Sequence, residues 1–418
     1  MRIVANEKSK SFLIFSVLST LYCFSAFYHV SNAAIAADLV HELKLNVEDL
    51  GILGGAFFYS FALLQIPMGV LLDRIGPRLI IGIFSLVGAL GAFIFALSHD
   101  FAYAIAGRVI MGIGMASVLM GSFKVFVNQF HEEKFSALSG LIVSIGVFGS
   151  LLATSPFAYL NTLLGWRNTF MCTAIITALL SLSVFWILKG TANKHVDGDF
   201  LCKNSTPHMN LTELMRFILG NLSFWQIGIL GFFRYGTTVA LQGLWLSPYL
   251  INVKGFDPIK TANVILMISL GMMLGYPLSG KLAKKYKATK KVALFGLSFY
   301  TLSLLPLTGF LRMNHEIDYA ILCFFLGFFT GFGMLNYTHV KELFPLNVSG
   351  TVIAGINFFL MAGGAVFMQA IGKIVEYSQL HQLSLSQSYH LAFAFCFIGM
   401  AGSLIFYLFS KESVQSSG

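Results

Sequence analysis

Long apolar segments alternate with short polar connections along nearly the whole chain. A continuous apolar run of about 20 residues is long enough to cross the hydrocarbon core of a bilayer as an α-helix. The runs are continuous rather than alternating, which argues against a transmembrane β-barrel. The pattern predicts an all-α membrane protein with twelve transmembrane helices, at residues 12–36, 49–71, 79–97, 101–128, 135–160, 169–189, 222–250, 259–280, 292–311, 319–340, 350–375 and 390–410.

One connection is longer and more polar than the others, and it divides the spans into six plus six. We therefore predict an N-terminal six-helix half at 1–190, a cytoplasmic linker loop at 191–221 with a short surface helix around 211–219, and a C-terminal six-helix half at 222–418. The halves echo one another: IPMGVLLDRIGPR follows the second span, and YPLSGKLAKKYKAT follows the eighth. Such internal similarity is typical of transporters built from a duplicated unit.

Composition agrees with a membrane protein. Of the 418 residues, 56% are hydrophobic and 11% are charged, whereas soluble proteins carry roughly 25% charged residues. The five cysteines form no CxxC pair, so we expect neither a disulfide framework nor a metal site. No phosphate-binding loop or nucleophile–base set is present, and we predict neither an enzyme nor a cofactor.

Basic residues predict the orientation of the spans. With the N-terminus inside, cytoplasmic segments hold 18 of the 27 Lys and Arg, and the opposite side holds six. The positive-inside rule then places both termini in the cytoplasm. This bias also explains the net charge of +9 without nucleic acid, because the basic run KLAKKYKATKK joins two spans.

Three short motifs lie in or next to the predicted spans. GVLLDRIGPR, residues 69–78, joins the second and third spans, Arg108-x-x-x-Gly112-x-Gly114 lies in the fourth, and GWRNTF, residues 165–170, leads into the sixth. They resemble three motifs of the major facilitator superfamily: the loop between helices two and three, the helix-four motif and the start of the sixth helix. With twelve spans and a central loop, the resemblance covers nearly the whole chain. It implies two six-helix halves that alternate access to a central site, in a bacterial inner membrane.

The loop after the second span is interpreted through this resemblance as a gating latch, formed by Gly69, Asp73, Arg74, Gly76 and Arg78. Glycines let helices two and three close tightly, and the family's acid meets the start of helix eleven, where a helix N-terminus favours negative charge. We expect the arginines to pair with acids. The second copy lacks the pattern, since Lys284 and Lys287 replace the acid and a glycine. The alternative is a solvated turn without a gating role.

Three cations and no deep acid lie within the spans. Arg108, Lys124 and Arg234 would each cost about 2.5–3.5 kcal/mol at the bilayer centre on insertion scales, so such residues usually line a cavity. Together they would attract a carboxylate or phosphate. Arg108 occupies a family motif position, so a structural or coupling role is an equal alternative. Lys124 lies near a helix end, where its side chain could extend to the interface.

Further polar residues inside the spans are candidate substrate contacts. The resemblance implies that helices one and seven face the central cavity, so the polar side chains on them are included. Each could instead form an interhelical hydrogen bond, and His29 could serve as a proton site. The candidates are Tyr28, His29 and Asn32 in the first span, Tyr235, Thr238, Gln242 and Trp245 in the seventh, and Asn336, His339 and Asn357 in the tenth and eleventh.

The favoured function is a secondary transporter, a symporter for uptake of a small anionic or zwitterionic solute such as an organic acid, an amino acid or a polycarboxylate chelator. A proton-coupled exporter of amphipathic compounds is an alternative, although the fifth span lacks the Gly- and Pro-rich exporter motif. A transporter-like membrane sensor is another, although the tail after the last span is short. We expect a monomer in the lipid bilayer, with protons as the coupling ion.

Overall fold

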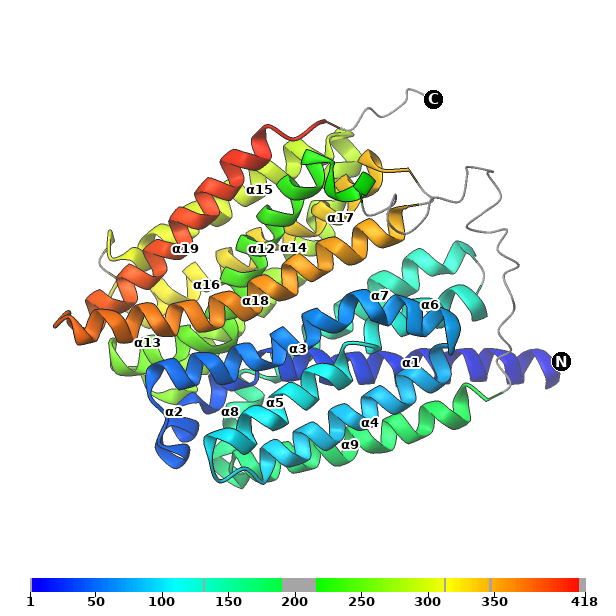
Figure 1. Cartoon of the computed structure of the whole chain (residues 1–418), viewed down its shortest axis with the longest axis horizontal. Helices are drawn as coiled ribbons and strands as arrows, with labels where there is room; N and C mark the ends of the chain where they lie inside the picture. Colours follow the sequence, from blue (N-terminus) through cyan, green and yellow to red (C-terminus); the bar gives the residue numbers. More distant parts are fainter. Residues whose placement is uncertain (1, 131, 190–215, 312, 346–347, 413–418) are drawn as a thin grey trace. The chain divides into compact units, whose positions relative to one another are not determined.

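The computed structural model describes residues 2–130, 132–189, 216–311, 313–345 and 348–412, and these residues are helical with no strand among them (Figure 1). They separate into two compact units. The first unit comprises Met1–Leu45 and Ala56–Gly198, and the second comprises Asn46–Gly55 and Asp199–Gly418. Most of the predicted linker lies outside the described residues, and its last part, 216–219, is helical.

The helices of the first half follow the first six predicted spans (Figure 1). They are drawn blue to green, and three of the six spans consist of two helices each. They are α1 (Arg2–Val30) with α2 (Asn32–Leu43), α3 (Val47–Arg74), α4 (Pro77–Ala96), α5 (Phe101–Met115) with α6 (Val118–Gln129), α7 (Glu132–Leu152) with α8 (Ser155–Leu164), and α9 (Trp166–Ile187).

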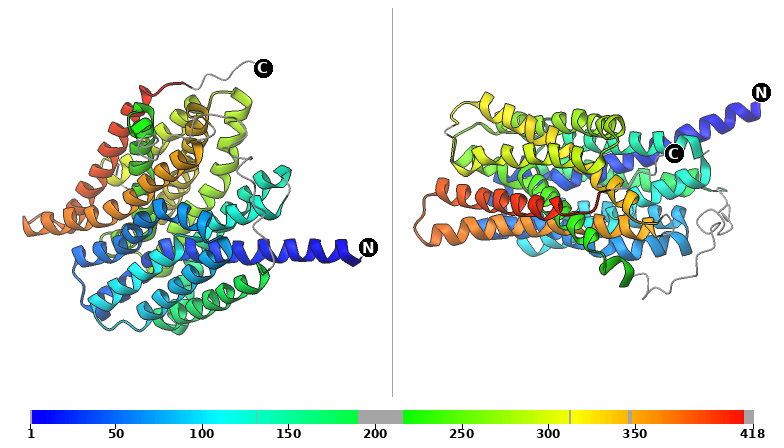
Figure 2. Two further views of the ribbon diagram at one scale, coloured as in Figure 1. Left: turned by 45° about the vertical axis from the view of Figure 1, so that its right-hand side comes forward. Right: turned by 90° about the horizontal axis from the view of Figure 1, so that it is seen from above.

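The helices of the second half follow the last six predicted spans (Figure 2). The orange helix α18 is long and unbroken, whereas the seventh and tenth spans are each interrupted. The helices are α12 (Leu222–Ala240), a π-helix η1 (Leu241–Trp245) and α13 (Leu246–Asn252); α14 (Pro258–Tyr286); α15 (Thr289–Leu304) with η2 (Leu305–Thr308); α16 (Glu316–Thr330), η3 (Gly331–Met334) and α17 (Leu335–Leu343); α18 (Ser349–Leu380); and α19 (Leu385–Leu408).

Both halves pair their helices in the same way. The first span packs on the fifth, as α1 on α7 and α12 on α18, and the third packs on the sixth, as α4 on α9 and α15 on α19. The fold class predicted from the sequence is confirmed, with ten helices of the described chain long and apolar enough to span a membrane. An eleventh is the pair Leu138–Leu152 and Ser155–Leu164, bent by 44°. Arg234 and its polar neighbours make α12 too polar to be counted.

The turn between α3 and α4 shows which glycine its backbone requires. Gly76 has a φ of +94° directly before Pro77, the first residue of α4, and L side chains disfavour that conformation. Its counterpart Lys287 also has a positive φ, +49°, without being glycine. By contrast, a Cβ added at Gly69 would meet no atom within 4 Å. The expected tight closure therefore does not depend on Gly69 in this structure.

Candidate functional site

Arg234 of α12 is buried in a cluster of hydroxyl groups. Its Nη1 donates to Thr330 Oγ1 at 3.5 Å, while its Nε has no hydrogen-bond partner among the described residues. Thr238 lies one turn further along α12, and its Oγ1 lies 2.9 Å from Thr330 Oγ1 and 2.8 Å from Tyr300 Oη. Tyr276 and Tyr337 lie close enough to interact with the charge of Arg234. The cation is thus surrounded by neutral oxygens rather than by a carboxylate.

The register between α12 and the tenth span explains how Arg234 fits. Thr238 contacts Thr330, and a Cβ added at Gly333 would lie 2.3 Å from Arg234 Nε. One turn earlier on α12, a Cβ added at Gly231 would lie 3.8 Å from Asn336 Nδ2. The α12 helix therefore runs antiparallel to α16–η3–α17. Gly333 leaves the space that the guanidinium occupies, so this glycine belongs to the site.

Asn336 is another buried polar residue on this contact line. Its side chain is 1% exposed, and both Oδ1 and Nδ2 lack a hydrogen-bond partner among the described residues. An unpartnered buried amide costs about 1–3 kcal/mol, so such groups are rare in the interior of a protein. Arg234 and Asn336 together present unpaired donors and an unpaired acceptor on neighbouring turns.

Other predicted contacts, on η1 and α18, form hydrogen bonds within the second unit. Gln242 donates from Nε2 to Ser269 Oγ at 2.8 Å, and Trp245 donates from Nε1 to the Met368 carbonyl at 2.8 Å. Asn357 accepts a hydrogen bond at Oδ1 from Tyr337 Oη, at 3.0 Å. These side chains have structural partners, in contrast to Asn336.

His339 is engaged away from Arg234 and Asn336, whereas Tyr235 contacts Arg234 through its ring. His339 Nδ1 lies 2.8 Å from Tyr407 Oη, and its Nε2 lies 3.0 Å from the Lys411 carbonyl, so this histidine joins α17 to the end of α19. Tyr235 places its ring 5.8 Å from the Arg234 guanidinium carbon. Its ring therefore provides a cation–π contact to the buried charge.

Arg108 of α5 occupies a different environment in the first unit. It is fully buried, and its Nη1 donates to the Tyr28 carbonyl of α1 at 3.0 Å. Its guanidinium carbon lies 5.0 Å from the centre of the Phe57 ring and 5.9 Å from that of Phe95. Its Nε and Nη2 have no hydrogen-bond partner among the described residues. Tyr28 is itself fixed by a 3.1 Å contact from its hydroxyl to Thr177 Oγ1.

The other first-span candidates, His29 and Asn32, are buried, and His29 shares the Phe57 ring with Arg108. His29 is stacked on Phe58 and meets Phe57 and Phe61 edge to face, and its Nε2 has no partner among the described residues. Asn32 is 1% exposed, and its side-chain Oδ1 and Nδ2 are likewise unpartnered there. Lys124 lies half-buried on α6 and has interactions of its own. The sequence thus led to a group of unpaired polar atoms in this unit also.

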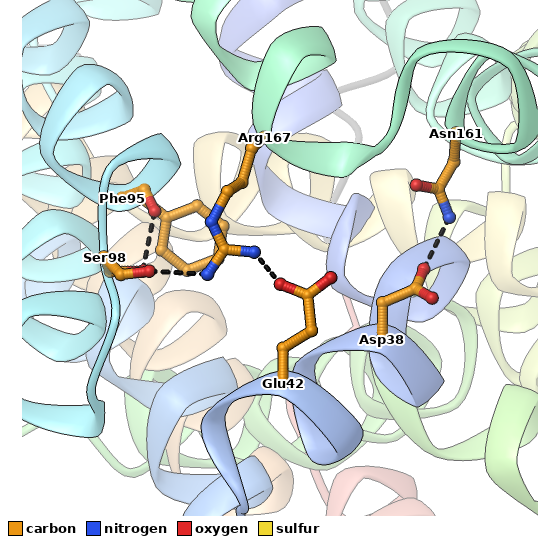
Figure 3. Close-up of polar contacts among 6 residues, drawn as sticks. All are labelled: Asp38, Glu42, Phe95, Ser98, Asn161 and Arg167. Atoms are coloured by element: carbon orange, nitrogen blue, oxygen red, sulfur yellow. Dashed lines mark hydrogen bonds and ion pairs between the residues drawn. The ribbon is translucent and has the colours of Figure 1, made fainter.

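The GWRNTF motif anchors the start of α9 rather than the candidate site (Figure 3). Arg167 forms an ion pair with Glu42 of α2, and its Nη2 donates to the Ser98 carbonyl beyond α4 at 2.7 Å. Next to this pair, Asn161 of α8 donates from Nδ2 to Asp38 Oδ2 at 2.6 Å. Arg167 of the motif therefore links the start of α9 to α2 and to the segment after α4, and the neighbouring Asn161 links α8 to α2.

The gating residues are described only in part. Arg78 donates from Nε to the Phe185 carbonyl of α9 at 3.0 Å, and no carboxylate among the described side chains forms an ion pair with it. Arg74 is exposed at the end of α3, and the side chain of Asp73 lies outside the described ones. The contact of Asp73 with helix eleven therefore stays a prediction.

No carboxylate forms an ion pair with Arg108 or Arg234 in the part of the chain that the structure describes. Nor do the described residues contain a group of three or more His, Cys, Asp or Glu that could hold a metal. A buried charge is stabilised by an opposite charge or by hydrogen bonds. The unpaired donors of both arginines are suited to an anion, and an arginine can hold a carboxylate through two parallel hydrogen bonds.

Residues 15–368 match the family model described as Major Facilitator Superfamily. The chain is 22% identical to a "Probable sulfoacetate transporter" of Cupriavidus necator over 87% of each chain. It is 24% identical to a D-galactonate transporter of Escherichia coli O6:H1, over 83% of this chain and 85% of that one. The fold matches a crystal structure of a bacterial homologue of the human lysosomal transporter Spinster with a TM-score of 0.73, at 15% identity and 96% coverage of both chains.

Proposed function

This chain belongs to the Major Facilitator Superfamily, and from that premise we propose that it is a secondary transporter that takes up a small organic anion across the bacterial inner membrane. It is a multi-pass membrane protein of a transporter fold and not an enzyme. Two relatives are described as transporters of sulfoacetate and of D-galactonate, which are organic anions. The proposed substrate is negatively charged, transport is directed into the cell, and both termini lie in the cytoplasm.

The proposal rests on two buried arginines that have no carboxylate partner among the described residues. Arg234 and Arg108 keep unpaired donor nitrogens while no described carboxylate neutralises them. Placing a charge within a membrane is costly, so intramembrane cations usually mark a path for substrate or ions. A bound carboxylate or sulfonate would supply both the missing charge and the missing hydrogen-bond acceptors.

Transport would proceed by alternating access, in which the two halves rock around a midplane site as in other transporters built from repeats. His29 is a candidate proton site for symport, because it is a histidine whose Nε2 is buried and unpartnered. The turn at Asp73 would act as the latch that holds one conformation. In that role Asp73→Asn should lower the transport rate more than substrate affinity, and a variant with normal turnover would exclude the latch.

Uptake into proteoliposomes tests the function directly. The purified protein is first screened by thermal shift against D-galactonate, D-glucarate, sulfoacetate and neutral galactose. An anion that raises the unfolding temperature is then followed as a labelled substrate with an imposed proton gradient. We expect uptake of at least one organic anion, accelerated by an inward proton gradient, and none of galactose. Accumulation of galactose without any organic anion would contradict the proposal.

A further inference from the structure

The buried amide of Asn336 has an unused donor and an unused acceptor beside the Arg234 guanidinium. Arg234 Nε lies where a side chain at Gly333 would begin, and Asn336 follows Gly333 by about one helical turn. Asn336 Nδ2 in turn lies opposite Gly231, about one turn before Arg234. The two side chains therefore neighbour one another along one contact line within the second unit, and both carry unpaired polar atoms.

The chemistry of the pair distinguishes between ligands. The guanidinium needs an acceptor, preferably an anion, whereas the amide needs one group that both donates and accepts. A hydroxyl is the smallest substituent that does both. An acid with a hydroxyl on the carbon next to its carboxylate carries the two groups side by side. The carboxylate could then meet Arg234 while the hydroxyl meets the neighbouring Asn336.

An α-ammonium group fits this site less well. An ammonium donates hydrogen bonds but accepts none, so it would leave Asn336 Nδ2 unpaired. It would also place a second cation beside Arg234, which no described carboxylate neutralises. A plain carboxylate accepts hydrogen bonds but donates none, so it would leave Asn336 Oδ1 unpaired, at a cost typical of buried unpaired groups.

We propose that Arg234 and Asn336 form a subsite for α-hydroxy acids, with Arg234 binding the carboxylate and Asn336 selecting for the hydroxyl. This inference rests on the proposed transport of organic anions and narrows the substrate class within it. Polyhydroxylated acids belong to this class, and the neighbouring hydroxyls of Thr238, Thr330 and Tyr300 would provide further partners for a longer chain of hydroxyl groups.

Three six-carbon acids test selection for the α-hydroxyl: 2-hydroxyhexanoate, hexanoate and norleucine. They share chain length and carboxylate and differ only in the α-substituent. Calorimetric titration of the purified protein should give an affinity for one enantiomer of 2-hydroxyhexanoate about tenfold or more above that for hexanoate, with norleucine weakest. D-galactonate and sulfoacetate are titrated alongside, as a long hydroxy acid and an anion without hydroxyls.

Asn336→Leu should bring the affinities for 2-hydroxyhexanoate and hexanoate within about twofold of each other, and should weaken D-galactonate about tenfold or more. Asn263→Leu, on an exposed face of α14, is the matched control and should change nothing. Thermal unfolding checks folding, and Asn336→Ala replaces the leucine variant if that one unfolds.

Two results would overturn the subsite. One is a wild-type protein that binds hexanoate or norleucine as tightly as the hydroxy acid, and the other is an Asn336 variant that keeps the preference. Failure of the broader proposal gives a different result, because then none of the organic anions binds, sulfoacetate included. The two failures are therefore distinguishable in one set of titrations.

Discussion

The two buried arginines come from opposite members of equivalent helix pairs. In the first unit Arg108 lies on the fourth span and donates to the carbonyl of Tyr28 on the first. In the second unit Arg234 lies on the first span of its half and contacts Thr330 at the end of α16, in the fourth. The same pair of helices thus carries a cation in each half, contributed by a different helix.

Their surroundings suggest different tasks. Arg108 is held by a main-chain carbonyl and by two phenylalanine rings, so its position is fixed by packing. Arg234 is surrounded by threonine and tyrosine hydroxyls, and a glycine leaves room for it. Hydroxyls can rearrange to serve a ligand, whereas a carbonyl and aromatic rings cannot. We therefore propose that Arg234 recognises the substrate directly, and that Arg108 contributes its positive charge from a fixed position, in a structural or coupling role.

The largest loss of anion affinity is expected from Arg234→Ala. Removing one partner of a desolvated charge pair costs about 2–5 kcal/mol, which corresponds to a loss of affinity of about thirtyfold or more. Arg234→Lys should lie between wild type and alanine, because lysine offers a point charge rather than two parallel bonds. Calorimetric titration with the anion selected by the thermal-shift screen measures both. Unchanged affinity in a folded alanine variant would remove Arg234 from the site.

Gly333→Ala tests the same site without changing its charge. The added methyl would meet the Arg234 guanidinium, 2.3 Å from Nε, and a flexible side chain yields more readily than a backbone. We expect a folded protein whose anion affinity falls about tenfold, or about 1.4 kcal/mol, as Arg234 is displaced. Gly402→Ala is the control, because its methyl would meet no atom within 4 Å. Equal affinity in the two variants would mean that Gly333 does not position Arg234.

Arg108→Gln should separate transport from binding. Glutamine can still donate to a main-chain carbonyl but removes the charge beside Phe57, Phe95 and His29. If Arg108 acts in coupling, the uptake rate should fall about tenfold while anion affinity changes less than about threefold. Uptake and titration on one preparation give both values. A loss of affinity as large as that of Arg234→Ala would show that the two arginines share one task.

The smallest effects are expected on the free energy of unfolding, at the equivalent turns of the two halves. Gly76 and Lys287 both have positive φ, but only Gly76 avoids the steric cost of that conformation. Lys287→Gly should therefore stabilise the protein by up to about 1 kcal/mol, since a non-glycine residue pays about 1–2 kcal/mol in left-handed backbone and glycine loses some of this to entropy. Gly76→Ala should destabilise by about 1 kcal/mol or more, because Gly76 combines a φ of +94° with a ψ of 152°, a region that is essentially restricted to glycine. Thermal unfolding of both variants provides the test, and a destabilised Lys287→Gly would contradict this reading.

The spans could be predicted from the sequence because the length of each continuous apolar run determines where a helix can cross the bilayer. The breaks within spans could not be predicted in this way. The π-helix at Leu241–Trp245 and the 3-10 turn at Gly331–Met334 interrupt apolar runs without a change in hydrophobicity. They depend on how a helix packs against neighbours far away in the sequence.

The candidate site was predicted in part for a similar reason. Arg234 and Asn336 were found because charges and amides are rare within spans. Thr330, Tyr300 and Gly333 were missed as site residues, because threonine, tyrosine and glycine are ordinary in membrane helices and only the register brings them to Arg234. Gly333 lies within an apolar run, and nothing in the sequence indicates that it leaves room for a guanidinium.

The most direct test of the account compares one ligand with and without its charge. D-galactonate and D-galactonamide differ only in replacement of the carboxylate by a neutral amide, and both are titrated into wild-type protein and Arg234→Ala. We predict that wild type binds the carboxylate at least about tenfold more tightly than the amide, and that Arg234→Ala loses this preference. Equal binding of the two compounds to wild type, or a preference that survives in Arg234→Ala, would contradict it.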